Sequence, residues 1–231
     1  FSGALKWDGE EVRHRYDAAA KYGDVVKIVS KATSLLDNLD LLRFRETVED
    51  LRPLMTMNVG PEGQLSRILS SVFGPLTHPL LPYPSAPGQL SFAQVNTGLH
   101  LVGRLPAKKF YLFGTPITHS KSPLLHNTGF QAFGLPHHYG IIESATVSED
   151  VLTAIRSPDF GGASVTIPHK LEIVQHLDEI SPHAKMIGAV NTIRPFVKDG
   201  ETKLLGDNTD WLGLREDRKS TRLNSSHRLY L

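Results

Sequence analysis

The 231-residue sequence contains no cysteine and no uninterrupted apolar run long enough for a membrane-spanning helix. Without cysteine, the chain cannot form disulfides, bind zinc through thiolates or use a thiol nucleophile. Hydrophobic residues make up 40% and charged residues 21%, which excludes disorder over the whole length. The sequence therefore predicts a cytoplasmic globular protein with one large domain or two ordinary ones, and no membrane partner.

A large excess of charge of one sign is also missing, because the formal net charge is only +1. Residues 215–231 contain five basic and two acidic residues, which leaves a net charge of −2 for the rest of the chain. Nucleic-acid binding needs lysines and arginines concentrated on a folded face, and residues 1–214 show no such concentration. We therefore expect no nucleic-acid partner. Eleven histidines leave a histidine metal site open, but no metal is predicted.

The first half of the chain alternates between strand-like and helix-like segments. β-branched runs predict strands, and leucines or isoleucines at helical spacing predict helices. Such β-α repeats imply a parallel sheet with functional groups at the carboxyl ends of its strands. Five prolines between Gly74 and Gly88 predict a loop. The expected elements are strands over 24–30 and 53–59 and helices over 10–23, 35–48, 62–73 and 91–103.

A short polar linker is expected over 104–109, and a second series of alternating elements follows it. This series predicts another α/β unit. Its expected strands cover 110–114, 138–142, 163–167, 189–193 and 204–206, and its expected helices cover 123–133, 148–156 and 168–177, with one more starting near Trp211.

The densest group of polar residues in the chain is GTPITHSKSPLLHN (114–127). Ser122 directly precedes Pro123, which predicts a helix with Ser122 as its N-cap and Pro123 as its first residue. The free N–H groups at such a helix start, together with the hydroxyls of Ser120 and Ser122, suit a carboxylate. On the local sequence alone, a serine that merely caps a helix is an equal alternative.

Three further polar groups each lie at the end of a predicted strand: SVTIPHK (164–170), GAVNT (188–192) and GDNTD (206–210). Together with 114–127 they resemble, in order and spacing, the substrate-binding domain of shikimate dehydrogenases. The resemblance spans about residues 110–213. It implies an α/β substrate-binding domain of an enzyme that reduces 3-dehydroshikimate to shikimate with NADPH.

This resemblance also implies a role for each polar residue of the second segment. Lys170 and Asp210 would be the catalytic pair, in which the lysine donates a proton to the carbonyl oxygen of the substrate. Taken alone, Lys170 could be a solvated side chain and Asp210 only a helix cap. The substrate-binding residues would be Ser120 and Ser122 for the carboxylate, and Thr166, Asn191 and Asp210 for the ring hydroxyls.

The nucleotide-binding half of a shikimate dehydrogenase is not recognisable in the sequence. In that family a Rossmann domain opens with a glycine-rich turn that holds the pyrophosphate of NADP. No G-x-G-x-x-G occurs in this chain, and the isolated pair Gly161–Gly162 does not qualify. No cofactor-binding residue is therefore assigned, and NADP is expected only for a parent protein.

Lys27 lies in the middle of the β-branched run GDVVKIV (23–29). A lysine in such a position either turns to solvent or has a lowered pKa. A lowered pKa suits imine formation, because only the neutral amine attacks a carbonyl. On the strand alone, an ordinary solvated lysine is the favoured interpretation.

Downstream, MTMNVGPEGQLSR (55–67), FG (73–74) and SAPGQLS (85–91) resemble the last strands of type I 3-dehydroquinate dehydratase. The resemblance covers about residues 1–103 and implies the C-terminal part of a (β/α)₈ barrel that converts 3-dehydroquinate to 3-dehydroshikimate.

By this second resemblance, Lys27 is the imine-forming lysine and Arg67 pairs with the substrate carboxylate. A planar guanidinium suits that task because it can hold a carboxylate bidentately. Ser85 and Gln89 would lie on a loop that closes over the substrate. The family's general-base histidine is expected before the first residue of this chain, and neither His14 nor His78 is assigned that role.

A dehydratase followed directly by a shikimate dehydrogenase is the order found in fungal pentafunctional polypeptides of the shikimate pathway. We therefore expect a fragment of such an enzyme that is inactive by itself. Its expected partners are small-molecule substrates. Whether the parent protein forms a homodimer is left open. The alternative is a non-catalytic regulator similar to quinate-pathway repressors, which would not need an imine lysine or a proton-transfer pair. Residues 215–231 are expected to be a non-native tail, because from Asp217 the sequence matches a translated sequencing adapter.

Overall fold

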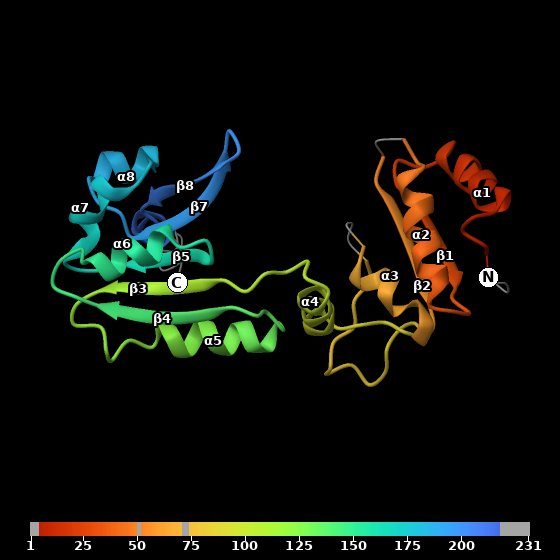
Figure 1. Cartoon of the computed structure of the whole chain (residues 1–231), viewed down its shortest axis with the longest axis horizontal. Helices are drawn as coiled ribbons and strands as arrows, with labels where there is room; N and C mark the ends of the chain where they lie inside the picture. The colour runs from red at the N-terminus through yellow and green to blue at the C-terminus, as the bar shows by residue number, and fades with distance from the viewer. Residues whose placement is uncertain (1–4, 50–51, 71–73, 218–231) are drawn as a thin grey trace, which may run out of the picture. The chain divides into compact units, whose positions relative to one another are not determined.

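Two compact units make up the chain (Figure 1), and each has its own hydrophobic core. The first unit contains residues 1–105 with 131–135, and the second contains 106–130 with 136–231. Both units alternate helices with strands, so the chain is mixed α/β as predicted. No helix among the described residues is both long and apolar enough to span a membrane. The computed structural model describes residues 5–49, 52–70 and 74–217.

The first unit is built on a parallel pair of strands, as the β-α pattern predicted. β1 and β2 pair in register from Val26 opposite Leu54 to Lys31 opposite Val59. The elements of this unit are α1 (Glu10–Ala20), β1 (Val26–Lys31), α2 (Leu36–Glu46), β2 (Leu54–Val59), the 3₁₀ turn η1 (Pro61–Gly63), α3 (Gln64–Ile68) and α4 (Phe92–Leu101).

One face of the β1–β2 pair carries the core of the first unit. Because side chains alternate along a strand, Val26 and Ile28 point to the same side, where they pack with Leu41 and Phe44 of α2. Lys27, between them, points to the opposite face and is exposed. Because of this alternation, the side chain of Lys27 points away from the core that is formed with α2.

The helix predicted over 62–73 is much shorter than the periodicity suggested. A 3₁₀ turn precedes it, and α3 covers only Gln64–Ile68; residues 71–73 lie outside the described part of the chain. A single short turn of helix is not stable by itself. Tertiary packing holds it, because α3 contacts α4 where Gly98 leaves room for the side chain of Ile68.

A six-stranded mixed sheet forms the second unit, in the order β4-β3-β5-β7-β8-β6. Only β7 runs antiparallel to its neighbours. The strands are β3 (Lys109–Gly114), β4 (His138–Glu143), β5 (Phe160–Val165), β6 (Glu179–Ile180), β7 (Thr192–Lys198) and β8 (Glu201–Asp207). The helical elements are α5 (Ser122–Ala132), α6 (Glu149–Arg156), α7 (His169–Glu172), η2 (Ile173–His176) and α8 (Pro182–Ile187), and the described residues 210–217 are also helical.

The β7–β8 hairpin is the main departure from the predicted elements. The sequence predicted two short strands, whereas β7 and β8 are seven residues each and pair antiparallel along their whole length. Asp199 and Gly200 form the connection with φ angles of 55° and 80°. An Asp-Gly pair between strands is a strong hairpin signal, which the sequence interpretation overlooked. β6 and α8 were also not predicted.

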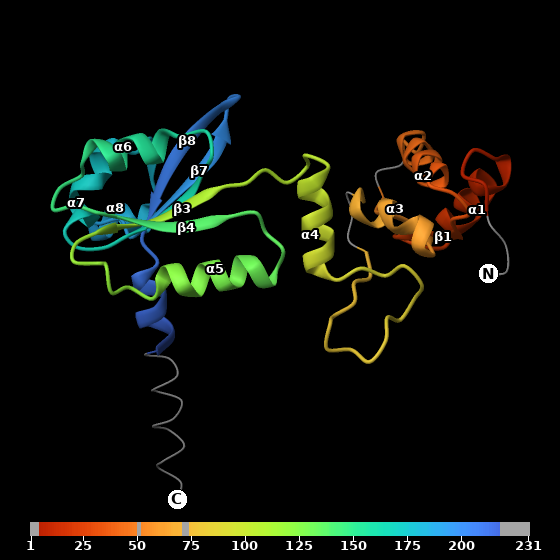
Figure 2. The same ribbon diagram turned by 60° about the horizontal axis from the view of Figure 1, so that its bottom comes forward.

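Helices cover both faces of this sheet (Figure 2). α5 lies on one face, where Phe130 packs against Leu112 and Tyr139. α6 lies on the other face, over the larger core that includes Phe113 and Ile193. Because β7 alone is antiparallel, its amino end meets the carboxyl ends of the other strands at one edge of the sheet.

Candidate active sites

The predicted residues of the second unit gather at that common edge. Ser120 and Ser122 follow β3, Lys170 follows β5, Asn191 immediately precedes β7, and Asp210 follows β8. Parallel strands expose functional groups at their carboxyl ends, and β7 adds its amino end to the same place. The topology therefore brings four separate sequence motifs to one edge.

Asp210 connects two of these motifs through its carboxylate. Its Oδ2 accepts a hydrogen bond from Lys170 Nζ at 2.7 Å, and its Oδ1 accepts one from Asn191 Nδ2 at 2.7 Å. The backbone supports this arrangement, because the N–H of Val190 donates to the carbonyl oxygen of Lys170 at 2.8 Å. Lys170, Asn191 and Asp210 thus form a continuous polar group, which we call the lysine–aspartate site.

The ion pair of this site is open to solvent on one side. The side chain of Lys170 is 30% exposed and that of Asp210 is 56% exposed. The hydrogen bond from Lys170 is the largest effect that lowers the pKa of Asp210 below its ordinary value. Burial acts in the opposite direction, and the Asn191 amide lowers the pKa further. The carboxylate of Asp210 is therefore ionised at neutral pH.

Two residues that the sequence interpretation missed hold Asp210 in place. Asn208 is buried; its Oδ1 accepts from the N–H of Asp210 at 3.1 Å, and its Nδ2 donates to the carbonyl oxygen of Ala189 at 3.0 Å. The N–H of Thr209 donates to Asn191 Oδ1 at 3.0 Å. An Asn two positions before Asp210, able to form such a local turn, was the available signal.

The serine pair lies at the start of α5, and this helix begins one residue earlier than predicted. α5 begins at Ser122, and the N–H of Leu125 donates to the carbonyl oxygen of Lys121, so Ser122 is inside the first turn and is not the N-cap. Ser120 Oγ accepts from the N–H of Ser122 at 3.2 Å and is 3.2 Å from Ser122 Oγ. The two hydroxyls are therefore adjacent.

Thr166 lies where the ends of β3 and β5 approach each other closely, next to the loop that carries Ser120. Its N–H donates to the carbonyl oxygen of Phe113 at 2.8 Å. Gly114 has a φ of 147°, and a Cβ there would collide with the side chain of Thr166. The chain needs glycine at this position so that the ends of β3 and β5 can meet.

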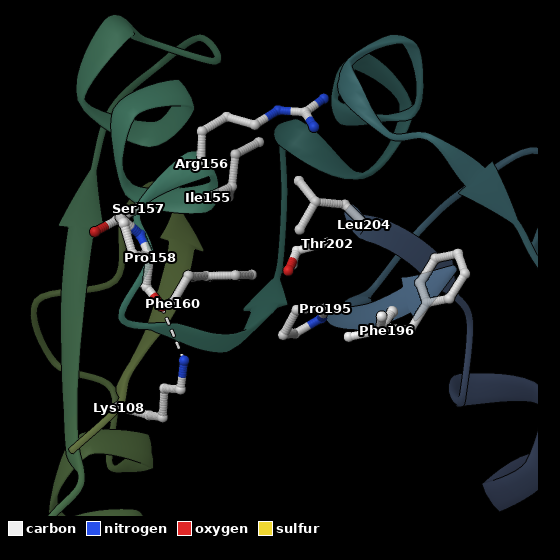
Figure 3. Close-up of a pocket in the computed structure, with 11 residues that line it drawn as sticks. Lys108, Ile155, Arg156, Ser157, Pro158, Phe160, Pro195, Phe196, Thr202 and Leu204 are labelled. Atoms are coloured by element: carbon white, nitrogen blue, oxygen red, sulfur yellow. Dashed lines mark hydrogen bonds between the residues drawn. The ribbon is translucent and has the colours of Figure 1, made fainter. Parts of the chain in front are cut away.

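A cavity of about 520 Å³ lies at the other end of these strands (Figure 3) and contains none of the predicted site residues. Phe160, Pro195 and Leu204 supply apolar walls, and Lys108 Nζ donates to the carbonyl oxygen of Pro158 at 2.9 Å. Thr202 and Leu204 belong to the first half of β8, whereas Asp210 follows its last residue. The cavity is therefore separate from the lysine–aspartate site.

In the first unit, Lys27 and Arg67 lie in very different surroundings. Lys27 is exposed on the open face of β1, opposite Met55 of β2 in the strand register. Arg67 is half-buried in α3, and its Nε and Nη2 atoms are buried without a hydrogen-bond partner. Burial lowers the pKa of Arg67. A guanidinium with two unpaired N–H groups is poised to receive a bidentate anion such as a carboxylate.

The loop that carries Ser85 and Gln89 is fixed against the end of β2. Gln89 is buried; its Oε1 accepts from the N–H of Ser85 at 2.9 Å, and its Nε2 donates to the carbonyl oxygen of Leu76 at 2.9 Å. Gly88 has a φ of 73°, and a Cβ there would collide with the backbone of Gly60, directly after β2. No hydrogen bond among the described residues joins Lys27 to Arg67 or to this loop.

Two family models match the chain in separate regions. Residues 1–106 match type I 3-dehydroquinase, and residues 112–193 match the shikimate dehydrogenase substrate binding domain. The chain is therefore similar to type I 3-dehydroquinase in its first region and to the shikimate dehydrogenase substrate binding domain in its second.

Pentafunctional AROM polypeptides are among the proteins that are similar to this chain along most of its length. The chain is 53% identical over 219 residues to that of Mycosarcoma maydis and 51% identical over 207 residues to that of Schizosaccharomyces japonicus, covering 93% and 89% of this chain. A solved structure named "Dehydroquinate dehydratase and shikimate dehydrogenase from S. pombe AroM" is 45% identical and aligns over 94% of this chain with a TM-score of 0.85.

This chain spans only part of those relatives, namely 13% of each curated polypeptide and 41% of the solved chain. It corresponds to the segment of an AROM polypeptide in which the two domains adjoin. Both matching family models are named for enzymes or enzyme domains.

Proposed function

We propose that this chain supplies the substrate side of two shikimate-pathway reactions in its parent polypeptide. The first is dehydration of 3-dehydroquinate to 3-dehydroshikimate, and the second is reduction of 3-dehydroshikimate to shikimate. The observation that carries the proposal is the double hydrogen bond of Asp210, which joins Lys170 and Asn191 at the strand edge. The substrates are small carboxylates, and the compartment is the cytoplasm.

In the second unit, Lys170 acts as the proton donor. Reduction of a ketone leaves an alkoxide oxygen that must gain one proton, and an ammonium within reach can provide it. Asp210 stabilises the ammonium form and orients it, because its carboxylate already accepts from Lys170 at 2.7 Å. Ser120 and Ser122 hold the substrate carboxylate, and Thr166, Asn191 and Asp210 bind the ring hydroxyls.

NADPH, the reductant in this enzyme family, does not fit the residues described here. The sequence has no G-x-G-x-x-G turn, and the strand-to-helix connections of the second unit are used by the polar residues of the substrate site. NADP is therefore assigned to the parent polypeptide, outside this chain. Residues 1–231 alone are accordingly expected to reduce no 3-dehydroshikimate, and NADPH consumption by the purified chain would contradict this.

In the first unit, Lys27 forms an imine with the substrate ketone. Its neutral amine adds to the carbonyl carbon, and loss of water gives the imine, from which the ring hydroxyl is eliminated as a second water molecule. Hydrolysis of the imine then restores the lysine. Arg67 binds the carboxylate through its unpaired N–H groups, and Ser85 and Gln89 lie on the loop that covers the substrate. The general base is assigned to no residue of this chain.

The domain boundaries belong to the same proposal. Residues 1–103 form the C-terminal part of a (β/α)₈ barrel, of which β1 and β2 are two strands. Residues 104–109 link it to the substrate-binding domain at 110–214, and 215–231 are a non-native tail. Residues 215–217 continue the helix after Asp210, and residues 218–231 lie outside the described part of the chain.

Substrate binding by the chain itself tests the proposal without requiring turnover. Titration of shikimate followed by NMR should shift backbone amide signals around Ser120, Lys170 and Asn191. The double variant Ser120→Ala/Ser122→Ala should weaken this binding, while Ser157→Ala, at the opposite end of the sheet, should leave it unchanged. Signals that move instead around the cavity at Ser157 would place the ligand site elsewhere.

A further inference from the structure

A fully buried group of polar side chains lies behind Arg67 in the first unit. Asn38, Asn58 and Ser66 have no exposed surface, and Trp7 is 3% exposed. They come from α2, β2, α3 and the segment before α1. Burying this many polar atoms is costly unless each finds a partner.

The indole of Trp7 fixes the orientation of the whole group. An indole N–H can only donate, and Trp7 Nε1 lies 2.7 Å from Asn58 Oδ1, which must therefore be the oxygen. Asn58 Nδ2 consequently faces the other way and donates to Asn38 Oδ1 at 3.2 Å and to the carbonyl oxygen of Asp37 at 3.2 Å. The direction of donation runs from Trp7 through Asn58 to Asn38.

Asn38 carries the chain of hydrogen bonds to the residues around α3. Its Nδ2 donates to the carbonyl oxygens of Leu35 at 2.9 Å and Glu62 at 2.7 Å. Its Oδ1 also accepts from the N–H of Ser66 at 3.2 Å. Every nitrogen and oxygen atom of both amides therefore has at least one hydrogen-bond partner, and such a satisfied polar network permits few alternative arrangements.

Ser66 completes the connection to β2. Its Oγ accepts from the N–H of Asn58 at 2.9 Å and donates to the carbonyl oxygen of Gly63 at 2.7 Å. α3 has only five residues, too few to hold its own position, and Ser66 is the residue directly before Arg67. The Nε and Nη2 atoms of the guanidinium are buried without a hydrogen-bond partner, so neither atom has a hydrogen bond that fixes its direction.

We infer that Asn38 and Asn58 are positioning residues for Arg67. They act through Ser66: the buried network locks α3 against β2 and thereby aims the unpaired guanidinium at the place of the substrate carboxylate. This inference rests on the proposed role of Arg67. An apolar residue of similar size at either position would fill the space but would no longer specify the direction of α3.

The test measures kinetics of 3-dehydroquinate dehydration in the full-length polypeptide. Asn38→Leu should raise KM about tenfold or more, with kcat changed far less, because a misdirected guanidinium binds the carboxylate poorly. Ser30→Ala is the matched control. Ser30 is also buried and lies opposite Asn58 in the strand register, and the side-chain hydrogen bonds that this variant loses go to the backbone of Leu5 and not to α3. Its KM should be normal.

A double-mutant comparison separates positioning from general destabilisation. In an Arg67→Met background, Asn38→Leu should cause no further rise in KM, because the group that it positions is gone. An equal rise in both backgrounds, or the same rise in Ser30→Ala, would overturn the inference. If Arg67→Met alone left KM unchanged, the carboxylate role of Arg67 would fail instead.

A milder variant covers the case in which Asn38→Leu does not fold. Trp7→Phe keeps an aromatic ring in the core but removes part of the ring volume and the N–H that orients Asn58. It should raise KM about threefold, again only when Arg67 is present. A Trp7→Phe protein with unchanged KM would contradict the proposed network role.

Discussion

The two candidate sites satisfy their charged groups in opposite ways. In the second unit, Lys170 and Asp210 pair with each other before any substrate arrives, and Asn191 completes the arrangement. In the first unit, Arg67 keeps its buried Nε and Nη2 atoms unpaired, and Lys27 is exposed and forms no side-chain ion pair with any described residue. A self-paired site is assembled in advance, whereas a site with an unpaired cation gains its missing partner from the ligand.

The largest expected effect is that of Lys27→Ala, which should abolish the activity of the first site and spare that of the second. In the full-length polypeptide, Lys27→Ala should abolish borohydride trapping of the substrate imine and with it dehydration, because Lys27 is the amine proposed to form the imine. Reduction of 3-dehydroshikimate should stay nearly normal. Both activities would be assayed on the same preparation, and loss of both together would mean that Lys27 has a structural role.

The next effect tests whether the paired groups of the second unit act together. Lys170→Met keeps the bulk of the side chain but removes its charge, so kcat for reduction should fall by roughly 10²–10⁴. KM should change much less, because the serines still hold the carboxylate.

Asp210→Asn and the double variant complete this test. The single variant should also lower kcat, and the double variant should be no worse than the poorer single one if the two residues form one unit. A Lys170→Met enzyme with normal kcat and a raised KM would show that the lysine only binds substrate.

A smaller effect concerns the stability of the first unit without ligand. Arg67→Met removes a buried cation whose N–H groups have no partner, so the free energy of unfolding should rise by about 1–3 kcal/mol. Trp7 and Trp211 lie in different units, so fluorescence of single-tryptophan variants in urea reports each unit separately.

Arg43→Met is the matched control for this experiment. Arg43 is an exposed arginine of α2 that pairs with Asp40 on the surface, and surface ion pairs contribute little. Its replacement should leave the unfolding midpoint nearly unchanged. Destabilisation of the first unit by Arg67→Met would mean that the guanidinium has a structural partner in solution.

The smallest effect is the acid sensitivity of the second unit. The pKa of Asp210 is lowered from its ordinary value of 3.8, chiefly by the hydrogen bond from Lys170. A lowered pKa adds stability above pH 3.8, which is lost as the pH falls through the folded-state pKa. Because the side chain is more than half exposed, solvent screening keeps this contribution small.

Asp210→Asn should therefore remove a small part of that pH dependence. Urea unfolding of the second unit at pH 6 and at pH 2.5 would measure the difference between variant and parent. The parent should be slightly more stable than the variant at pH 6, and the gap should close at pH 2.5. A gap that widened on acidification would contradict the paired geometry.

Local patterns in the sequence predicted most of the elements, whereas the roles of the candidate residues came from the resemblance to two enzyme families. β-branched runs and the spacing of leucines identified β1, β2 and α2, because strand and helix periodicities depend on neighbours along the chain. The same reasoning overestimated α3, whose length is set by contact with α4. It also missed β6 and α8, and it did not use the Asp199–Gly200 turn that reverses β7.

What the sequence by itself determined is therefore the chemistry that is available: a lysine in a β-branched strand, an arginine after a short turn, and four polar motifs at predicted strand ends. Only the tertiary structure decided which of these groups meet. The reversal of β7 brings Asn191 to the edge where Asp210 and Lys170 lie. Hydrogen bonds between residues 20 or more positions apart, such as those of Asn58 and Asn38 behind Arg67, depend on three-dimensional packing, and no local periodicity encodes them.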